Sequence, residues 1–341
     1  MKNNFLEITL SESEKSLIRQ GLSTIKYEPD GSNNYITKIR IAAYKHFPSR
    51  ILKLLEDRKS LKKHTPCIVF NNIPIDDQVY GSPSTSETGI DYKSGCISEN
   101  TICAFGSIIG EPYSILFEGR ELVNNLTPQK ESKNDYTGMG SEVELDFHIE
   151  NSALKFMSED DCSPMAMFLM GVRSDQKESG PKTYVSDSRE ALKLLDNETL
   201  NILRTNNYII KLPYRWRGAF NKRKENTDLC PIITGPLKMP RLSAVFYPDM
   251  VLAVNDPAKQ AFNNLYKAVK SVAYATHITP GKLVYIDNRY MLHSRENFTA
   301  TYDESGLPYR WVQRLFITSN LWNLRSFKCK GERIFDPTLN S

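Results

Sequence analysis

A short stretch of alternating polar and apolar residues, 144–150 (ELDFHIE), places the strongest constraint on what this chain can build. The alternation predicts a β-strand with one face in the core. Because residues i and i+2 of a strand point the same way, His148 and Glu150 would present an imidazole and a carboxylate to one point in space. Two histidines and one carboxylate can hold Fe(II) and leave coordination positions open. The motif alone decides nothing, since His-x-Glu also occurs by chance on polar strand faces.

The composition is typical of a globular protein. The chain has 341 residues, 40% hydrophobic and 25% charged, which suffices for a large core. Its net charge of +4 is spread along the chain without a basic stripe, so we expect no nucleic-acid partner. No window approaches the roughly 20 apolar residues of a membrane helix, and the first residues lack the apolar segment of a secretion signal. We therefore expect a soluble, cytoplasmic protein that binds no membrane; the oligomeric state stays unknown.

The predicted elements indicate a mainly β fold with flanking helices. Ser11 and Glu14 form a capping-box pattern at the start of a helix, and Asp256 followed by Pro257 predicts another helix with Asp256 as N-cap. We expect one domain over residues 1–341, with helical decoration over about 1–65. Residues 213–240 show little periodicity, which predicts either an active-site lid or a solvated loop. Strands are expected at 67–70, 113–117, 143–150, 165–171, 183–185, 208–212, 242–254, 282–286, 290–293 and 309–317.

A third metal ligand has to come from elsewhere in the chain, which contains five histidines. His293 follows a predicted strand, turn and strand, and this position suits a ligand that closes the mouth of a barrel. His46, His64 and His277 lie near helix ends or in a lysine-rich turn, where a structural or solvated role explains them better. His293 is therefore the candidate.

Two arginines near the carboxyl end share one face of a predicted strand. Arg310 and Arg314 would lie about 13 Å apart at roughly 3.3 Å per residue. Two guanidinium groups that point into an apolar barrel are costly unless each meets an anion, and the guanidinium fork matches carboxylates. The alternative is a pair of surface arginines with their charges in solvent.

Taken together, these motifs resemble the clavaminate synthase-like group of Fe(II)/2-oxoglutarate-dependent oxygenases, which is related to taurine dioxygenase. The resemblance covers roughly residues 95–325. It implies a double-stranded β-helix, or jelly roll, with His148, Glu150 and His293 as iron ligands and with 2-oxoglutarate and O2 as co-substrates. The segments that carry it are 147–151 (FHIEN), 180–185 (GPKTYV), 287–289 (DNR), 293–295 (HSR) and 310–314 (RWVQR).

The same resemblance assigns roles around the metal. Arg310 would hold the distal carboxylate of 2-oxoglutarate, and Thr183 stands at a co-substrate-binding position. Arg314 would clamp the α-carboxylate of an amino-acid substrate, and Glu118 would contact its α-amino group. Both arginines would then have an anion.

The substrate expectation rests on one carboxylate. Members of this group hydroxylate free amino acids, including arginine, asparagine and lysine, and the arginine-specific ones carry an Asp-x-Asp pair where this chain has Tyr247 and Asp249. One carboxylate suits a compact ammonium better than a guanidinium fork. We therefore predict hydroxylation of free L-lysine, at C4 or C3. The alternative interpretation of Asp249 is that it is an ordinary turn residue that follows a proline.

Several other functions remain open. If the chain is a 2-oxoglutarate-dependent oxygenase, the alternative substrates are L-arginine, L-asparagine or a lysine inside a larger metabolite. If it is not, the alternatives are a non-catalytic, cupin-like metal-binding protein or a zinc hydrolase with the same three ligands. The two arginines favour the oxygenase, because a hydrolase needs no anchor for 2-oxoglutarate.

Overall fold

The computed structural model describes residues 5–60, 65–84, 87–176, 180–217 and 225–338. Within them the α-helices are α1 (Glu12–Leu22), α2 (Asn33–His46), α3 (Ser49–Glu56), α4 (Ile97–Ile109), α5 (Ser188–Ala191), α6 (Asn197–Leu203) and α7 (Asp256–Ser271). The capping box at Ser11 and Glu14 is confirmed at the start of α1. The N-cap of α7 is Asn255, not Asp256 as predicted, because the Asn255 side chain accepts the N–H of Ala258.

Strands form most of the centre of the molecule, as the sequence predicts. They are β1 (Phe5–Thr9), β2 (Cys67–Asn71), β3 (Glu111–Ile115), β4 (Asn124–Leu126), β5 (Leu145–His148), β6 (Ala166–Arg173), β7 (Lys182–Asp187), β8 (Tyr208–Ile210), β9 (Ile233–Thr234), β10 (Arg241–Leu242), β11 (Val251–Ala253), β12 (Tyr274–His277), β13 (Leu283–Ile286), β14 (Met291–Arg295), β15 (Trp311–Thr318), β16 (Lys328–Cys329) and β17 (Ile334–Asp336). The expected strand at 242–254 is instead two short strands, β10 and β11, separated by the turn around Pro248.

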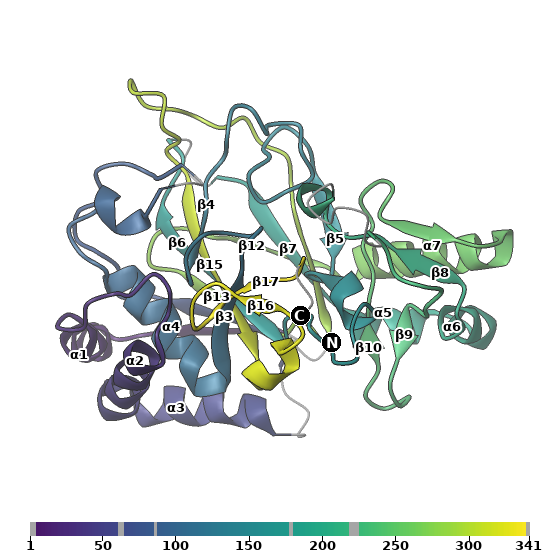
Figure 1. The fold of residues 1–341 in the computed structure, drawn as a ribbon, viewed down its shortest axis with the longest axis horizontal. Coiled ribbons are helices and arrows are strands. Elements are labelled where there is room, and N and C mark those ends of the chain that lie inside the picture. Colours follow the sequence, from purple (N-terminus) through teal and green to yellow (C-terminus); the bar gives the residue numbers. More distant parts are fainter. Residues whose placement is uncertain (1–4, 61–64, 85–86, 177–179, 218–224, 339–341) are drawn as a thin grey trace.

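The larger sheet has the order β1-β2-β13-β6-β15-β3-β17-β16, and β4 also pairs with β15. Most neighbours are antiparallel, but β1 joins β2 in parallel, a pairing between distant segments that the sequence did not predict. Helices α1–α4 lie along one side of this sheet, and α5–α7 lie on the opposite side of the molecule (Figure 1). The helical region before residue 65 is therefore tied to the sheet through β1.

Strand β6 shows how the larger sheet is buried on both faces. Ala166, Phe168 and Met170 pack in the cluster that contains helices α1–α4. Met167 and Leu169 belong to the cluster on the other face, which reaches the smaller sheet. A strand that is covered on both sides reads as a continuous apolar run, which explains why the segment AMFLM lacks polar alternation.

The smaller sheet has the antiparallel order β12-β7-β14-β5. A cavity lies between the two sheets. Met167, Leu169 and Val312 of the larger sheet line it, and so do Thr183 and His293 of the smaller one. The two sheets together, and the helices behind them, therefore fix the walls of this cavity.

The structure describes all six cysteines, and each of them is free. In the described part of the chain, no helix has the length and apolar character needed to cross a membrane.

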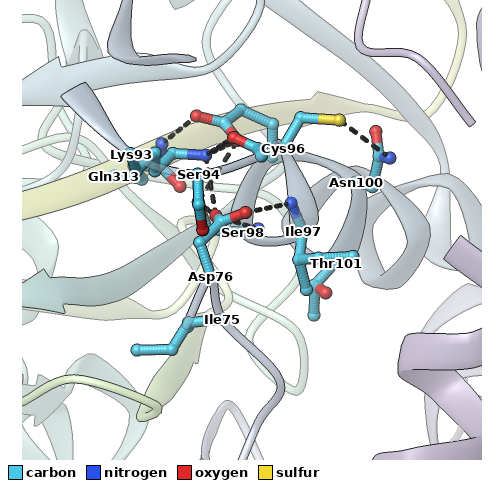
Figure 2. A network of polar contacts seen from close by, with 12 residues as sticks. Ile75, Asp76, Lys93, Ser94, Cys96, Ile97, Ser98, Asn100, Thr101 and Gln313 are labelled. Atoms are coloured by element: carbon cyan, nitrogen blue, oxygen red, sulfur yellow. Dashed lines mark hydrogen bonds and ion pairs between the residues drawn. The ribbon is translucent and has the colours of Figure 1, made fainter. Parts of the chain in front are cut away.

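A buried ionic network connects the start of α4 to strand β15. The Lys93 ammonium lies 2.7 Å from an Asp76 oxygen and 2.5 Å from a Glu99 oxygen, and all three side chains are almost fully buried. Asp76 also accepts the backbone N–H groups of Ile97 and Ser98 at the helix start (Figure 2). The side-chain amide of Gln313 on β15 donates to Glu99 across 2.7 Å. The network thus fixes the strand that carries Arg314.

We expect Lys93→Met to destabilise the folded protein by about 3–5 kcal/mol, because two buried carboxylates would lose their shared cation. The free energy of unfolding, measured in urea, checks this value. Lys238→Met is the matched control, since Lys238 is exposed. Equal stability of the two variants would show that the network adds nothing to the fold.

Candidate active site

Two neighbouring strands of the smaller sheet bring distant histidines together. His148 is the last residue of β5 and lies opposite His293 of β14 in the antiparallel pairing. Their rings are 4.0 Å apart between centroids. One ligand atom from each of His148, Glu150 and His293 lies within 4.8 Å of the others, and all three residues are buried. The structure therefore brings the three predicted metal ligands into one cluster.

The His148 ring is oriented by the main chain. Its Nδ1 lies 2.8 Å from the carbonyl oxygen of Asp146, so Nδ1–H donates and Nε2 keeps its lone pair for the cluster. Burial, reinforced by the nearby His293, lowers the pKa of His148 to about 3. The imidazole is therefore neutral at ordinary pH, which is the form that binds metal ions.

Glu150 reaches the cluster in a way that differs from the prediction. Strand β5 ends at His148, so Glu150 lies in a turn and the two-residue period of a strand does not place it. The buried Asn288 side chain holds this turn instead. Its amide oxygen accepts the N–H of Glu150 at 2.8 Å, and its amide nitrogen donates to the Glu150 carbonyl at 3.1 Å and the Pro164 carbonyl at 2.8 Å.

The Glu150 side chain is a carboxylate in this setting. Burial alone would raise the pKa of Glu150, but the Arg314 guanidinium and the two histidines outweigh it and hold the pKa below its usual range. One Glu150 oxygen lies 3.6 Å from His293 Nε2 and 3.5 Å from Arg314 Nη1.

The cluster fits a divalent metal. Two imidazoles and one carboxylate form the donor set of an open Fe(II) site. The ring nitrogen of His293 that faces Glu150 is Nε2, and its buried Nδ1 has no hydrogen-bond partner among the described residues. The donor set and the spacing of the three side chains therefore fit a divalent metal.

One end of the cavity is cationic. Arg310 is buried, and burial lowers the pKa of its guanidinium to about 10, although the charge of Asp175 acts in the opposite direction. Within the described part of the chain no carboxylate lies at ion-pair distance from Arg310; its contact is the Phe298 ring at 5.5 Å. Arg295, also buried, donates to the carbonyls of Gly140 and Val143, and burial together with Arg310 lowers its pKa to about 9. Two such cations create a site for an anionic ligand.

Thr183 and Ser294 add hydroxyl groups to this cationic end. Both line the cavity and are buried. Thr183 on β7 lies opposite Arg295 on β14. The hydroxyl of Ser294 has no hydrogen-bond partner among the residues that the structure describes. Arg310 and Thr183, which the sequence assigned to the co-substrate, therefore occur together here.

The other end of the cavity is organised by Glu118. This buried carboxylate accepts from Arg314 Nη2 at 2.6 Å, Arg215 Nη2 at 2.6 Å and the indole N–H of Trp216 at 2.9 Å. Burial alone would lower the pKa of Arg314, but Glu150 and Glu118 outweigh it and raise the pKa. The predicted pair of Arg314 and Glu118 therefore lies together in the cavity wall.

Asp249 does not lie with the other predicted site residues. Its side chain is 55% exposed, pairs with Lys211 at 2.7 Å and lies 3.7 Å from Arg217. It follows Pro248 in a turn with a φ of 60°, and it is absent from the cavity lining, to which Lys211 contributes. The turn interpretation describes this position better than direct contact with the substrate, because two cations already neutralise the carboxylate.

The remaining predicted segments are placed only in part. His46 and His277 lie outside the metal cluster, and His64 lies outside the described residues. Of the proposed lid at 213–240, residues 218–224 are also outside them. Residues 213 and 215 line the cavity, and Trp216 is fully buried beside Phe117.

Three functional residues were missed by the sequence reasoning. Arg295 lies two positions beyond His293 on the same strand, so the two-residue period could have identified it. Asn288 and Arg215 act through partners more than 90 positions away in the chain, Glu150 and Glu118. Such pairings leave no local pattern in the sequence.

The sequence and fold match known oxygenases. The chain is 22% identical over 329 residues to L-asparagine oxygenase of Streptomyces coelicolor, which covers 94% of this chain and 92% of that protein. It is 20% identical over 319 residues to L-lysine 3-hydroxylase of Catenulispora acidiphila, covering 92% and 84%. A crystal structure of asparagine oxygenase with Fe(II), (2S,3S)-3-hydroxyasparagine and succinate superposes with a TM-score of 0.81 at 21% identity, over 97% of this chain and 99% of that one.

The family described as taurine catabolism dioxygenase TauD, TfdA family matches residues 95–316. This span contains the cluster of His148, Glu150 and His293. It also contains two arginines of the cavity, Arg314 on β15 and Arg310 just before that strand. The chain therefore belongs to the TauD/TfdA family of dioxygenases.

Proposed function

We propose that this dioxygenase hydroxylates a free L-amino acid. In the balanced reaction, an amino-acid C–H, 2-oxoglutarate and O2 give the C–OH product, succinate and CO2. One observation carries the proposal: a buried His-Glu-His cluster shares a cavity with Arg310, a buried guanidinium without a carboxylate partner among the described residues.

The cationic end of the cavity is the proposed site for 2-oxoglutarate. Arg310 would hold the distal carboxylate through its guanidinium fork, with Thr183 as a hydroxyl donor. Arg295, which is fixed by backbone carbonyls, adds positive potential. His148, Glu150 and His293 would hold Fe(II), which together with O2 and 2-oxoglutarate supplies the oxidising power for C–H hydroxylation.

The opposite end is the proposed site for the amino-acid backbone. Arg314 would bind the substrate α-carboxylate, and Glu118 would accept from the α-ammonium. In the present arrangement these two residues pair with each other. A zwitterion that inserts between them satisfies both charges again, so little charge is left unpaired in the bound state.

The finer assignments remain proposals. The similarity to an L-lysine 3-hydroxylase supports L-lysine, hydroxylated at C4 or C3. Asp249, the residue on which that prediction rested, would first have to leave Lys211 and enter the cavity. L-Asparagine is the second candidate, supported by the similarity to an asparagine oxygenase. We also propose a jelly-roll arrangement of the two sheets, a single domain over residues 1–341 and a cytoplasmic location.

A panel of the twenty amino acids tests the reaction directly. At least one should raise succinate release above the substrate-free level when Fe(II) and 2-oxoglutarate are present, and the hydroxylated amino acid should appear by mass spectrometry. His148→Ala should lose this activity, because it removes one of three metal ligands. A panel in which no amino acid stimulates succinate release rejects the proposal.

Arg310→Ala should raise KM for 2-oxoglutarate by about ten- to a hundredfold, since a charge-assisted hydrogen bond contributes roughly 1.5–3 kcal/mol. Succinate release as a function of 2-oxoglutarate concentration measures the change. Arg325→Ala, which removes a half-exposed arginine paired with Asp160, should behave as wild type. An unchanged KM in Arg310→Ala would place 2-oxoglutarate elsewhere.

Asn288→Ala should weaken Fe(II) binding by roughly 10–100-fold, because residues that orient metal ligands contribute on this scale. Calorimetric titration with metal measures the affinity. Asn100→Ala is the matched control. Its buried amide also bonds backbone carbonyls, those of Leu22 and Ile25, but lies outside the cavity lining. It should lower stability while leaving metal affinity intact. Equal metal affinity in both variants would contradict the role of Asn288.

A further inference from the structure

The lining of the cavity carries far more positive than negative charge. Among the described residues, its cations are Lys211, Arg215, Arg295, Arg310 and Arg314, and its carboxylates are Glu118 and Glu150. Both carboxylates have assigned partners. Glu150 belongs to the metal cluster, and Glu118 accepts from three donors. No lining carboxylate remains for a cationic substrate side chain.

Asp249, on the turn before the lining residue Met250, does not supply the missing carboxylate. Asp249 is more than half exposed and is held by Lys211 and Arg217. Lys211 lowers the pKa of Asp249, so the carboxylate stays charged and paired with that lysine.

Among the described cations that line the cavity, Lys211 is the one that belongs neither to the proposed 2-oxoglutarate site nor to the proposed site for the α-carboxylate and α-ammonium of the substrate. It directly follows β8, and its N–H donates to the carbonyl of Met250 at 2.8 Å, which fixes it beside another lining residue. Nearby, the buried Tyr247 stacks on Tyr136 with parallel rings 5.8 Å apart. Tyr247 also meets His148 edge-on at 5.5 Å. An aromatic wall next to the metal cluster and a lysine at its edge define the surroundings of a substrate side chain.

We infer that this cavity selects an amino acid whose side chain ends in an oxygen acceptor, a carboxamide or a carboxylate, and that Lys211 determines this specificity. This inference rests on the proposed function and disagrees with lysine as the preferred substrate. A lysine or ornithine side chain would bring an ammonium into a wall of cations, and its desolvation would go uncompensated. An acceptor side chain would instead gain a charge-assisted hydrogen bond from the Lys211 ammonium, which has three N–H donors and uses one of them on Asp249.

The experiment compares kcat/KM for asparagine, glutamine, aspartate and glutamate with that for lysine and ornithine. Wild type should favour one of the first four by at least about tenfold, or 1.4 kcal/mol. Comparing kcat/KM for asparagine and glutamine with kcat/KM for aspartate and glutamate shows whether the preferred acceptor is an amide or a carboxylate. Preference for lysine, ornithine or an apolar amino acid overturns the inference.

Two variants of Lys211 test its part in selection. Lys211→Met should raise KM for the preferred substrate by about tenfold, by loss of one charge-assisted hydrogen bond. Lys211→Glu should shift the ratio of kcat/KM towards lysine, because it puts a carboxylate in the wall. Lys193→Met is the matched control, since Lys193 pairs with Glu190 on the surface. An unchanged substrate ratio in Lys211→Glu contradicts the role of Lys211.

The outcomes separate this inference from the proposed function. Succinate release that no amino acid stimulates would reject the function itself. Stimulation by lysine and ornithine alone would keep the function and reject only the inferred selection.

Discussion

The active site depends on the antiparallel pairing of β5 with β14, which places His148 opposite His293. These residues are 145 positions apart, and only the completed smaller sheet brings their rings within 4.0 Å. Glu150 then turns towards them because Asn288, next to the start of β14, holds its main chain from both sides. The metal cluster is thus a product of sheet register. A shift of either strand by one residue would turn its histidine to the opposite face of the sheet, away from the other ring.

Buried charge explains the layout of the rest of the cavity. Arg314 lies between Glu118 and Glu150, so each charge at that end has a partner. Arg310 and Arg295 have no carboxylate at ion-pair distance in the described structure, and this is why we propose that an anionic co-substrate binds at that end. Behind the same strand, Gln313 connects β15 to the ionic network of Lys93, Asp76 and Glu99. Neighbouring residues of one strand therefore serve binding on one face and stability on the other.

The sequence predicts features that depend on local periodicity. The capping box at Ser11 and the mainly β core follow from patterns within a few residues. Arg310 and Arg314 both line the cavity, but Arg310 lies just before β15 and a register shift follows Trp311, so the strand period alone does not place it. The three residues proposed as metal ligands were predicted from one strand motif and from a family resemblance. They lie in one buried cluster, and the residues that match the family include all three.

What the sequence does not predict depends on distant partners. The parallel pairing of β1, the capping of Glu150's turn by Asn288 and the bonds from Arg215 to Glu118 are all long-range contacts. Asp249 illustrates the same limit. Its aspartate chemistry suggested a substrate contact, but a turn with positive φ directs it to Lys211 and solvent.

In the proposed reaction, oxygen from O2 enters an amino acid while 2-oxoglutarate is decarboxylated. Turnover under 18O2, with the amino acid that stimulates succinate release, tests this reaction directly. We expect 18O in the new hydroxyl group and in succinate, in equal molar amounts of the two products. A hydroxylated product that takes its oxygen from water, or labelled succinate without a labelled amino acid, would contradict it.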